Sequence, residues 1–199
     1  MIFVGSDDRA LARNIARHLF GKLPRRGTII ILEGTPASAT SRERLLGFHD
    51  ALAERPAINV RCSLRGDYQR DVARAVFLRV KDQWPGVDAV LCANDVMALG
   101  VLDALDANAG GGPLVVGVNA IPEAVAAIAA GRMLATADFN AMAMSEIATE
   151  AAVRHLRGET IPPEIMLPVR IVDAGNCAAW NVPFAARPSP VWEDVVRRR

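Results

Sequence analysis

Short β-branched runs alternate with amphipathic helical stretches along most of the chain. Runs typical of buried strands occur at Ile2–Val4, Thr28–Leu32, Ile58–Cys62, Ala89–Cys92, Leu114–Val118, Leu134–Ala137 and Val169–Val172. The spacing of apolar residues predicts helices at Ala10–Leu23, Arg42–Arg55, Asp71–Gln83, Val96–Ala107, Pro122–Ala130 and Met142–Arg157. Strict alternation of strand and helix implies parallel strands joined by right-handed crossovers. The pattern therefore predicts an α/β fold, a doubly wound and mainly parallel sheet with helices on both faces.

Capping residues and prolines refine the predicted boundaries of the helices and strands. Ser41 and Asp95 each stand just before a helical pattern, so we expect both to be N-caps. The segment after the last predicted strand contains three prolines, and it predicts an irregular tail at 174–199 that lies across the surface.

Composition narrows the class of protein. The 199 residues are 51% hydrophobic, which is enough for a core and argues against disorder. The formal net charge is only +1, so a nucleic-acid partner is not expected, because such modules usually carry a basic face. The longest apolar runs, such as Thr28–Leu32, are far shorter than the ~20 residues of a membrane span. The start of the chain as written has no basic segment followed by an apolar one, so no export signal is expected there.

Polar side chains follow most of the predicted strands. In an open parallel sheet, ligands bind beyond the carboxyl ends of the strands. These ends are Glu33–Pro36, Arg65–Tyr68, Ala93–Asp95, Asn119–Ile121 and Asp138–Asn140, and Arg44 lies in the first turn of the helix after the first of them. Arginine and asparagine make forked hydrogen bonds to vicinal hydroxyls, and an aromatic ring packs on the apolar face of a sugar. The set suits a small polyhydroxylated ligand.

Each of these residues also has a purely structural interpretation. Asp95 could serve merely as the cap of its helix, and Asn94 could serve merely to hydrogen-bond nearby backbone groups. Arg44 could be a solvated helix charge, and Tyr68, the only tyrosine, could be plain core packing.

Signatures of catalysis and of metal binding are absent from the sequence. It has no Gly-x-Ser-x-Gly elbow, no His-Glu-x-x-His and no Walker loop, so we expect neither an enzyme nor a cofactor. His18, His49 and His155 fall on predicted helices without an acidic or cysteine partner at metal spacing. Cys62, Cys92 and Cys177 have no paired spacing, so neither a disulfide framework nor a zinc site is expected.

Five segments carry a further signal: 34–48, Asn94–Gly100, 115–124, Leu134–Ala137 and Leu156–Glu159. In their order and spacing they resemble the ribose-type periplasmic sugar-binding proteins, which share their fold with the cores of sugar-responsive repressors. The segment 34–48 is similar to the one by which these proteins enter their second lobe. Asn94-Asp95-Val96-Met97-Ala98-Leu99-Gly100 is similar to the family's Asn-Asp-x-Met-Ala-x-Gly signature, and 115–124 matches its Val-Gly-Phe-Asp-x-x-Pro-Glu-Ala pattern. The match also includes Leu134–Ala137 and Leu156–Glu159, and it extends from about Val4 to Val172.

The resemblance implies roles for five residues. Arg44 would bind sugar hydroxyls, Tyr68 would stack on the ring and Asn94 would hydrogen-bond a hydroxyl. Asn119 and Phe139 would also line the site, where the family usually places an aspartate and often a glutamine. These two departures weaken the case for ribose itself, because an amide cannot make the charge-assisted bond of a carboxylate.

The resemblance also implies an incomplete receptor. Residues 1–5 would be a remnant of an N-terminal lobe, 6–139 the C-terminal α/β lobe, 140–165 a crossover helix that packs on the missing lobe, 166–173 a return strand and 174–199 the tail. The apolar positions Met144, Ile147, Ala148 and Ala151 would then lack a partner, so we expect residues 142–157 to pack elsewhere or to drive homo-oligomerisation.

The implied function is carbohydrate binding in a sugar ABC transporter. The ligand would be a monosaccharide, the partner a permease and the compartment the periplasm. The alternative is the effector-binding core of a sugar-responsive regulator of the repressor type, and an α/β enzyme is a third, less favoured class. Without an export signal, the chain expressed as written would stay in the cytoplasm.

Overall fold

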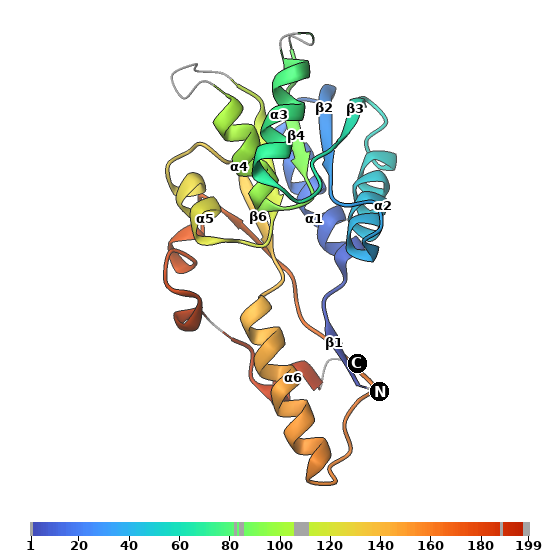
Figure 1. The fold of residues 1–199 in the computed structure, drawn as a ribbon, viewed down its shortest axis with the longest axis vertical. Helices are drawn as coiled ribbons and strands as arrows, with labels where there is room; N and C mark the ends of the chain where they lie inside the picture. Colours follow the sequence, from blue (N-terminus) through green and yellow to red (C-terminus); the bar gives the residue numbers. More distant parts are fainter. Residues whose placement is uncertain (1, 82, 84–85, 106–111, 188, 197–199) are drawn as a thin grey trace.

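A six-stranded sheet forms the centre of the larger part of the molecule (Figure 1). The computed structural model describes residues 2–81, 83, 86–105, 112–187 and 189–196. The strand order is β3-β2-β4-β5-β6-β8, and all neighbours are parallel except β6 and β8. The strands are β2 (Gly27–Glu33), β3 (Ile58–Arg65), β4 (Ala89–Cys92), β5 (Leu114–Val118), β6 (Ala135–Asp138) and β8 (Arg170–Asp173). The predicted α/β fold with a mainly parallel sheet is confirmed.

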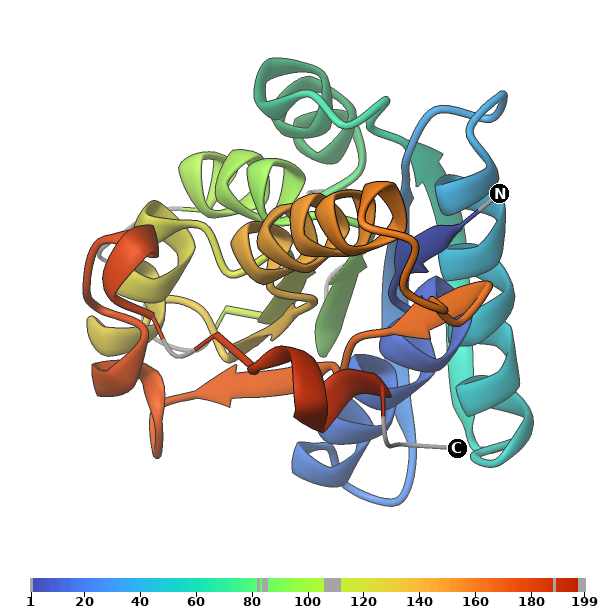
Figure 2. The same cartoon turned by 90° about the horizontal axis from the view of Figure 1, so that it is seen from below.

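Five helices cover the two faces of this sheet. They are α1 (Asp8–Lys22), α2 (Ala39–Ala53), α3 (Arg70–Lys81), α4 (Asp95–Ala104) and α5 (Pro122–Ala129). Figure 2 shows α1 and α2 on one side of the sheet and α3, α4 and α5 on the other. Ile29–Leu32 and Ala89–Cys92 are fully buried between these layers, as a strand covered on both faces requires. Residue 82 of the predicted helix Asp71–Gln83 and residues 106–107 of the predicted helix Val96–Ala107 lie outside the described residues.

A second, smaller group of elements extends from the carboxyl-end side of the sheet (Figure 1). It consists of the parallel pair β1 (Phe3–Gly5) and β7 (Glu164–Met166), the long helix α6 (Ala141–Leu156) and the short helix α7 (Trp192–Val196). Its own apolar cluster includes Ile147, Ala151, Ile165 and Trp192. The first predicted strand therefore forms, but it pairs with β7 and not with the main sheet.

Two predicted N-caps are wrong. The α2 helix begins at Ala39, so Ser41 lies inside it and Ser38 is the cap, its Oγ accepting from the Ser41 amide at 3.3 Å. The α4 helix begins at Asp95 itself, and Asn94 caps it by accepting from the Met97 amide at 2.9 Å. In both helices the capping residue precedes the predicted one, because the first turn continues further toward the N-terminus than the apolar spacing indicates.

The segment after β8 is more ordered than the irregular tail expected at 174–199. It contains the 3-10 helices η1 (Cys177–Ala179) and η2 (Phe184–Ala186) as well as α7. Trp180, Arg187 and Trp192 are all buried. Two tryptophans bury enough apolar area to hold a segment that its prolines alone would leave irregular. Among the described residues, no helix combines the length and the apolar content needed to cross a membrane.

Candidate functional site

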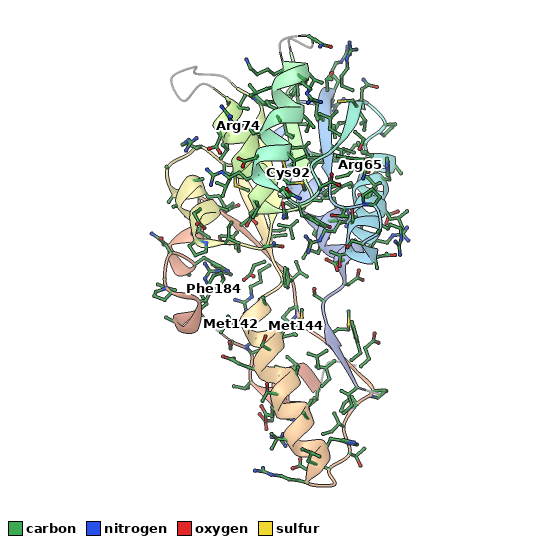
Figure 3. The ribbon with its side chains drawn as sticks, viewed as in Figure 1. Arg65, Arg74, Cys92, Met142, Met144 and Phe184 are labelled. Atoms are coloured by element: carbon green, nitrogen blue, oxygen red, sulfur yellow. The ribbon has the colours of Figure 1, made fainter. Side chains whose placement is uncertain are left out.

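The five residues proposed from the sequence line one open hollow. This strand-end hollow has a volume of about 490 Å³ and lies where the parallel strands of the main sheet end. The smaller group of elements also contributes, through β1 and through Met144, which Figure 3 shows at the end of α6 nearest the sheet. The lining residues are Phe3, Val4, Gly5, Ser6, Asp8, Ser38, Thr40, Arg44, Tyr68, Asn94, Asn119, Phe139 and Met144.

Arg44 is buried beneath the hollow, contrary to its interpretation as a solvated helix charge. Its Nε donates to Asp8 Oδ1 at 2.8 Å, and its Nη1 donates to the Ala93 carbonyl oxygen at 2.7 Å. Nη1 also lies 3.4 Å from Asn119 Oδ1, and the Phe139 ring centre is 5.9 Å from the guanidinium carbon. One guanidinium thus connects α1, the end of β4 and the loop after β5.

A close approach of α1 and α2 makes this ion pair possible. A Cβ atom added at Gly47 of α2 would lie 2.2 Å from the Arg9 carbonyl oxygen of α1. Glycine at this position therefore allows the two backbones to pack at a distance that brings Asp8 to Arg44.

Tyr68 presents its ring to the hollow. It has a φ of 61°, a left-handed conformation that is uncommon for a residue other than glycine. A Cβ atom added at Gly34 would lie 2.1 Å from the ring carbon Cζ, so the ring lies directly over Gly34. The hydroxyl oxygen is itself buried, and this burial raises the pKa of Tyr68. The aromatic face, not the hydroxyl, is therefore what Tyr68 offers to a ligand.

Asn94 has both a structural position and access to the hollow. Its Oδ1 caps α4, which confirms that it satisfies a local backbone group. Since the oxygen is used by the cap, the amide nitrogen is the group that Asn94 can offer to a ligand.

A buried carboxylate holds the loop that carries Asn119. Asp95 is fully buried, and it accepts from the Thr136 hydroxyl at 2.6 Å and from the Ile121 amide at 3.0 Å. Burial raises the pKa of Asp95 to about 7, although these hydrogen bonds oppose the shift. The Ala120 amide donates to the Thr136 hydroxyl at 3.2 Å. Asp95 therefore positions the site and does not cap its helix.

Strained backbone is concentrated at the strand ends. Besides Tyr68, the described non-glycine residues with positive φ are Asp67, Asn119, Ala120 and Asn140. All of them closely follow a strand of the main sheet. Such conformations cost about 1–3 kcal/mol each and persist where the surroundings over-determine them, as at ligand sites.

Several lining residues were not proposed from the sequence. Asp8 follows the run Ile2–Val4 as the other polar residues follow their strands, so the same rule would have found it. Phe3 and Met144 enter the hollow only because the smaller group of elements folds toward the sheet, and no local pattern signals this.

The chemistry of the hollow favours an uncharged polar ligand. Asp8 and Arg44 are the only charged residues among its lining residues, and they neutralise each other. Amide groups and aromatic faces make up much of the remaining lining. No cluster of three or more possible metal ligands occurs among the described residues, and the described cysteines are all unpaired.

The sequence matches a known family. A family model described as "Periplasmic binding protein domain" matches residues 1–160. The D-allose-binding periplasmic protein of Escherichia coli is 37% identical over 137 residues, which are 67% of this chain and 44% of that protein. The D-ribose/D-allose-binding protein of Pseudomonas aeruginosa is 30% identical over 177 residues, 86% of this chain and 55% of that protein. The chain thus spans about half the length of the curated relatives that it matches.

Solved structures of sugar-binding proteins are similar to this chain in fold. An ABC transporter periplasmic solute binding protein from Actinobacillus succinogenes with bound D-allose has a TM-score of 0.86 at 27% identity, over 89% of this chain and 64% of that one. The Caulobacter myo-inositol binding protein bound to myo-inositol has a TM-score of 0.81 at 30% identity, over 89% and 62%. The resemblance carried by the strand-end motifs is confirmed, and the chain belongs to the periplasmic binding protein domain family, in its ribose-binding-like group.

Proposed function

We propose that the chain binds an uncharged monosaccharide in the strand-end hollow and is the C-terminal sugar-binding lobe of a substrate-binding protein of a sugar ABC importer. In this proposal, 6–139 form the lobe, 1–5 are a remnant of the other lobe, and 140–165 cross over to it. Residues 166–173 return to the sheet, and 174–199 are a C-terminal extension. The assignment to one lobe is supported by the length of the relatives, because the chain spans about half of them.

One observation carries the proposal. Five residues from five separate segments, Arg44, Tyr68, Asn94, Asn119 and Phe139, line a single hollow whose charged lining residues cancel. The amides of Asn94 and Asn119 would donate to sugar hydroxyls, and the rings of Tyr68 and Phe139 would pack on apolar sugar faces. Arg44 would bind hydroxyls while it holds Asn119 in place.

The wider role follows from the relatives. They are named as binding proteins for D-allose and D-ribose, and a structural neighbour is named as an ABC transporter solute binding protein. We accordingly infer a binding function without catalysis, a permease as partner and the periplasm as compartment.

Calorimetry with a panel of pentoses, hexoses and myo-inositol tests the proposal. We expect weak, millimolar binding, because an open hollow leaves water competing for each hydroxyl. Asn119→Gly should reduce the affinity about tenfold, since it removes the amide at a position where glycine tolerates the φ of 117°. The matched control, Asn181→Gly, changes an exposed asparagine outside the hollow.

Three results would contradict the account. Absence of binding to every sugar at high concentration would contradict the function. Micromolar binding would contradict the expectation that the open hollow alone binds a sugar weakly. Equal affinity of the wild-type protein and Asn119→Gly for a sugar would contradict the placement of the sugar site in the strand-end hollow.

A further inference from the structure

The segment after β8 lies outside the matched family domain, which ends at residue 160, yet it makes buried polar contacts. Trp180 and Arg187 are both more than nine-tenths buried, at 8% exposure each. Arg187 stacks on Phe184, with 4.2 Å between the guanidinium carbon and the ring centre. Figure 3 shows Phe184 beside the region where α6 meets the sheet.

The first contact is made by Trp180. Its indole Nε1 donates to Asp138 Oδ2 at 2.7 Å. The other carboxylate oxygen of Asp138 accepts from the Asn140 amide at 2.7 Å. Asp138 and Asn140 flank Phe139 in the chain, so the carboxylate links Trp180 to the turn that presents Phe139 to the hollow.

The second contact is made by Arg187. Its Nη1 donates to the Ala120 carbonyl oxygen at 2.7 Å. Ala120 is fully buried and adjoins Asn119, and both residues have positive φ. Because the Ala120 amide also donates to Thr136, both backbone polar groups of this strained residue are hydrogen-bonded.

Burial of the Arg187 guanidinium costs free energy, because two of its nitrogens lose their hydrogen bonds to water. Its Nε and Nη2 are buried without a hydrogen-bond partner among the described residues. An arginine kept only for packing would be replaced by an apolar side chain without that cost. The hydrogen bond to Ala120 supplies a reason for retaining a guanidinium.

We propose that Trp180 and Arg187 are positioning residues of the strand-end hollow. Through their hydrogen bonds, Trp180 holds the loop that presents Phe139, and Arg187 holds the loop that presents Asn119. Their effect on a sugar rests on the proposed function, whereas their effect on the loops does not. The two effects are therefore measured separately.

Amide hydrogen exchange, followed by NMR on the full chain, measures the effect on the loops. Trp180→Phe keeps a large ring and removes the N–H donor, and Arg187→Met removes the guanidinium. We expect the first variant to speed exchange at Asn140 and the second at Ala120 and Ile121, each about tenfold relative to the core amides Ile30 and Val90. Arg187→Lys, which keeps a donor, should restore most of the protection, and Val182→Ala, a change at an exposed residue of the same segment, should have no effect.

Unchanged exchange at these loop amides would overturn the proposal. Equal acceleration of loop and core amides would also overturn it, because that result reports global destabilisation. For any sugar that the wild-type protein binds, calorimetry should show about a tenfold loss of affinity in both variants. Faster loop exchange with unchanged affinity would overturn the positioning role in binding. If the wild-type protein binds no sugar, the proposed function fails while the exchange data still decide whether the two residues hold the loops.

Discussion

Buried polar side chains at the strand ends determine how the hollow is built. The sequence shows that Asp95 follows a strand and that Arg44 lies in the helix after another strand, but the burial of these two side chains is not predictable from it. Burial depends on which loop lies over each side chain, and that follows from the tertiary arrangement of strands β4, β5 and β6. The sequence could therefore indicate which residues gather at the hollow, but not that Asp95 supports it from within.

The raised pKa of Asp95 predicts a pH dependence of stability. Its pKa is about 7 in the folded protein against an ordinary value of 3.8, so the folded state retains a proton that the unfolded chain releases. This contribution to the free energy of unfolding is fully present below about pH 4 and is lost as the pH rises through 7. Urea unfolding at pH 4.5, 6 and 8 should show a contribution of a few kcal/mol that declines with pH, and Asp95→Asn should flatten this decline.

Other titrating groups act in both proteins, so the comparison isolates Asp95. The carboxyl groups of Asp50 and Asp103 have lowered pKa values beside Arg9 and Arg70, and they favour stability at higher pH. The interpretation of Asp95 would be refuted by parallel pH profiles for wild-type protein and Asp95→Asn.

At the scale of elements, the strands of the main sheet and the helices between them were predictable, whereas β7 and the short helices after β8 were not. The bounds of β4 and β5 agree with the predicted runs at Ala89–Cys92 and Leu114–Val118. β7, η1 and η2 have three residues each and α7 has five, too few for a period to show. β1 is equally short, and it was predicted only because Ile2–Val4 is a continuous apolar run. Pairing of β1 with β7 joins residues about 160 positions apart, which no local pattern indicates.

The contact between α1 and α2 predicts opposite effects of two glycine substitutions. Gly47→Ala should destabilise the protein by about 1–3 kcal/mol, because the new Cβ would clash with the backbone of Arg9. Gly21→Ala, in α1 with no atom within 4 Å of the added Cβ, should be stabilising by about 0.5–1 kcal/mol. Chemical denaturation of the two variants measures both values, and similar signs would contradict the proposed close approach.

The α6 helix has one covered face and one exposed face. Met144, Ile147 and Ala151, which we expected to lack a partner, pack within the chain in the smaller apolar cluster. By contrast, Met142, Val153 and Leu156 are exposed, Leu156 at 85%. Exposed apolar surface of this kind favours association, so we expect the chain to form homo-oligomers through residues 142–157. Sedimentation velocity at increasing concentration should show a rising mass, and Val153→Glu with Leu156→Glu should abolish the rise. A concentration-independent monomer in the wild-type protein would refute this expectation.

At the scale of the whole molecule, two groups of elements meet at the hollow. The larger group supplies Arg44, Tyr68, Asn94, Asn119 and Phe139, and the smaller group supplies Phe3 and Met144. Family motifs in the sequence are sufficient to indicate the first set. The contribution of the smaller group depends on the three-dimensional arrangement, because that group forms only when β1 pairs with the distant β7. The contribution of the C-terminal segment does so as well, because this segment lies beyond the matched domain.

A titration of isotope-labelled protein with D-allose, D-ribose and myo-inositol, followed by two-dimensional NMR, tests the central claim most directly. We predict that at least one of them shifts the side-chain amides of Asn94 and Asn119 and the backbone amides of Tyr68 and Phe139, while the amides of Ser145, Thr149 and Val153 on the exposed face of α6 stay unchanged. Shifts confined to α6, or no shifts with any of the three ligands at high concentration, would contradict a sugar site in the strand-end hollow.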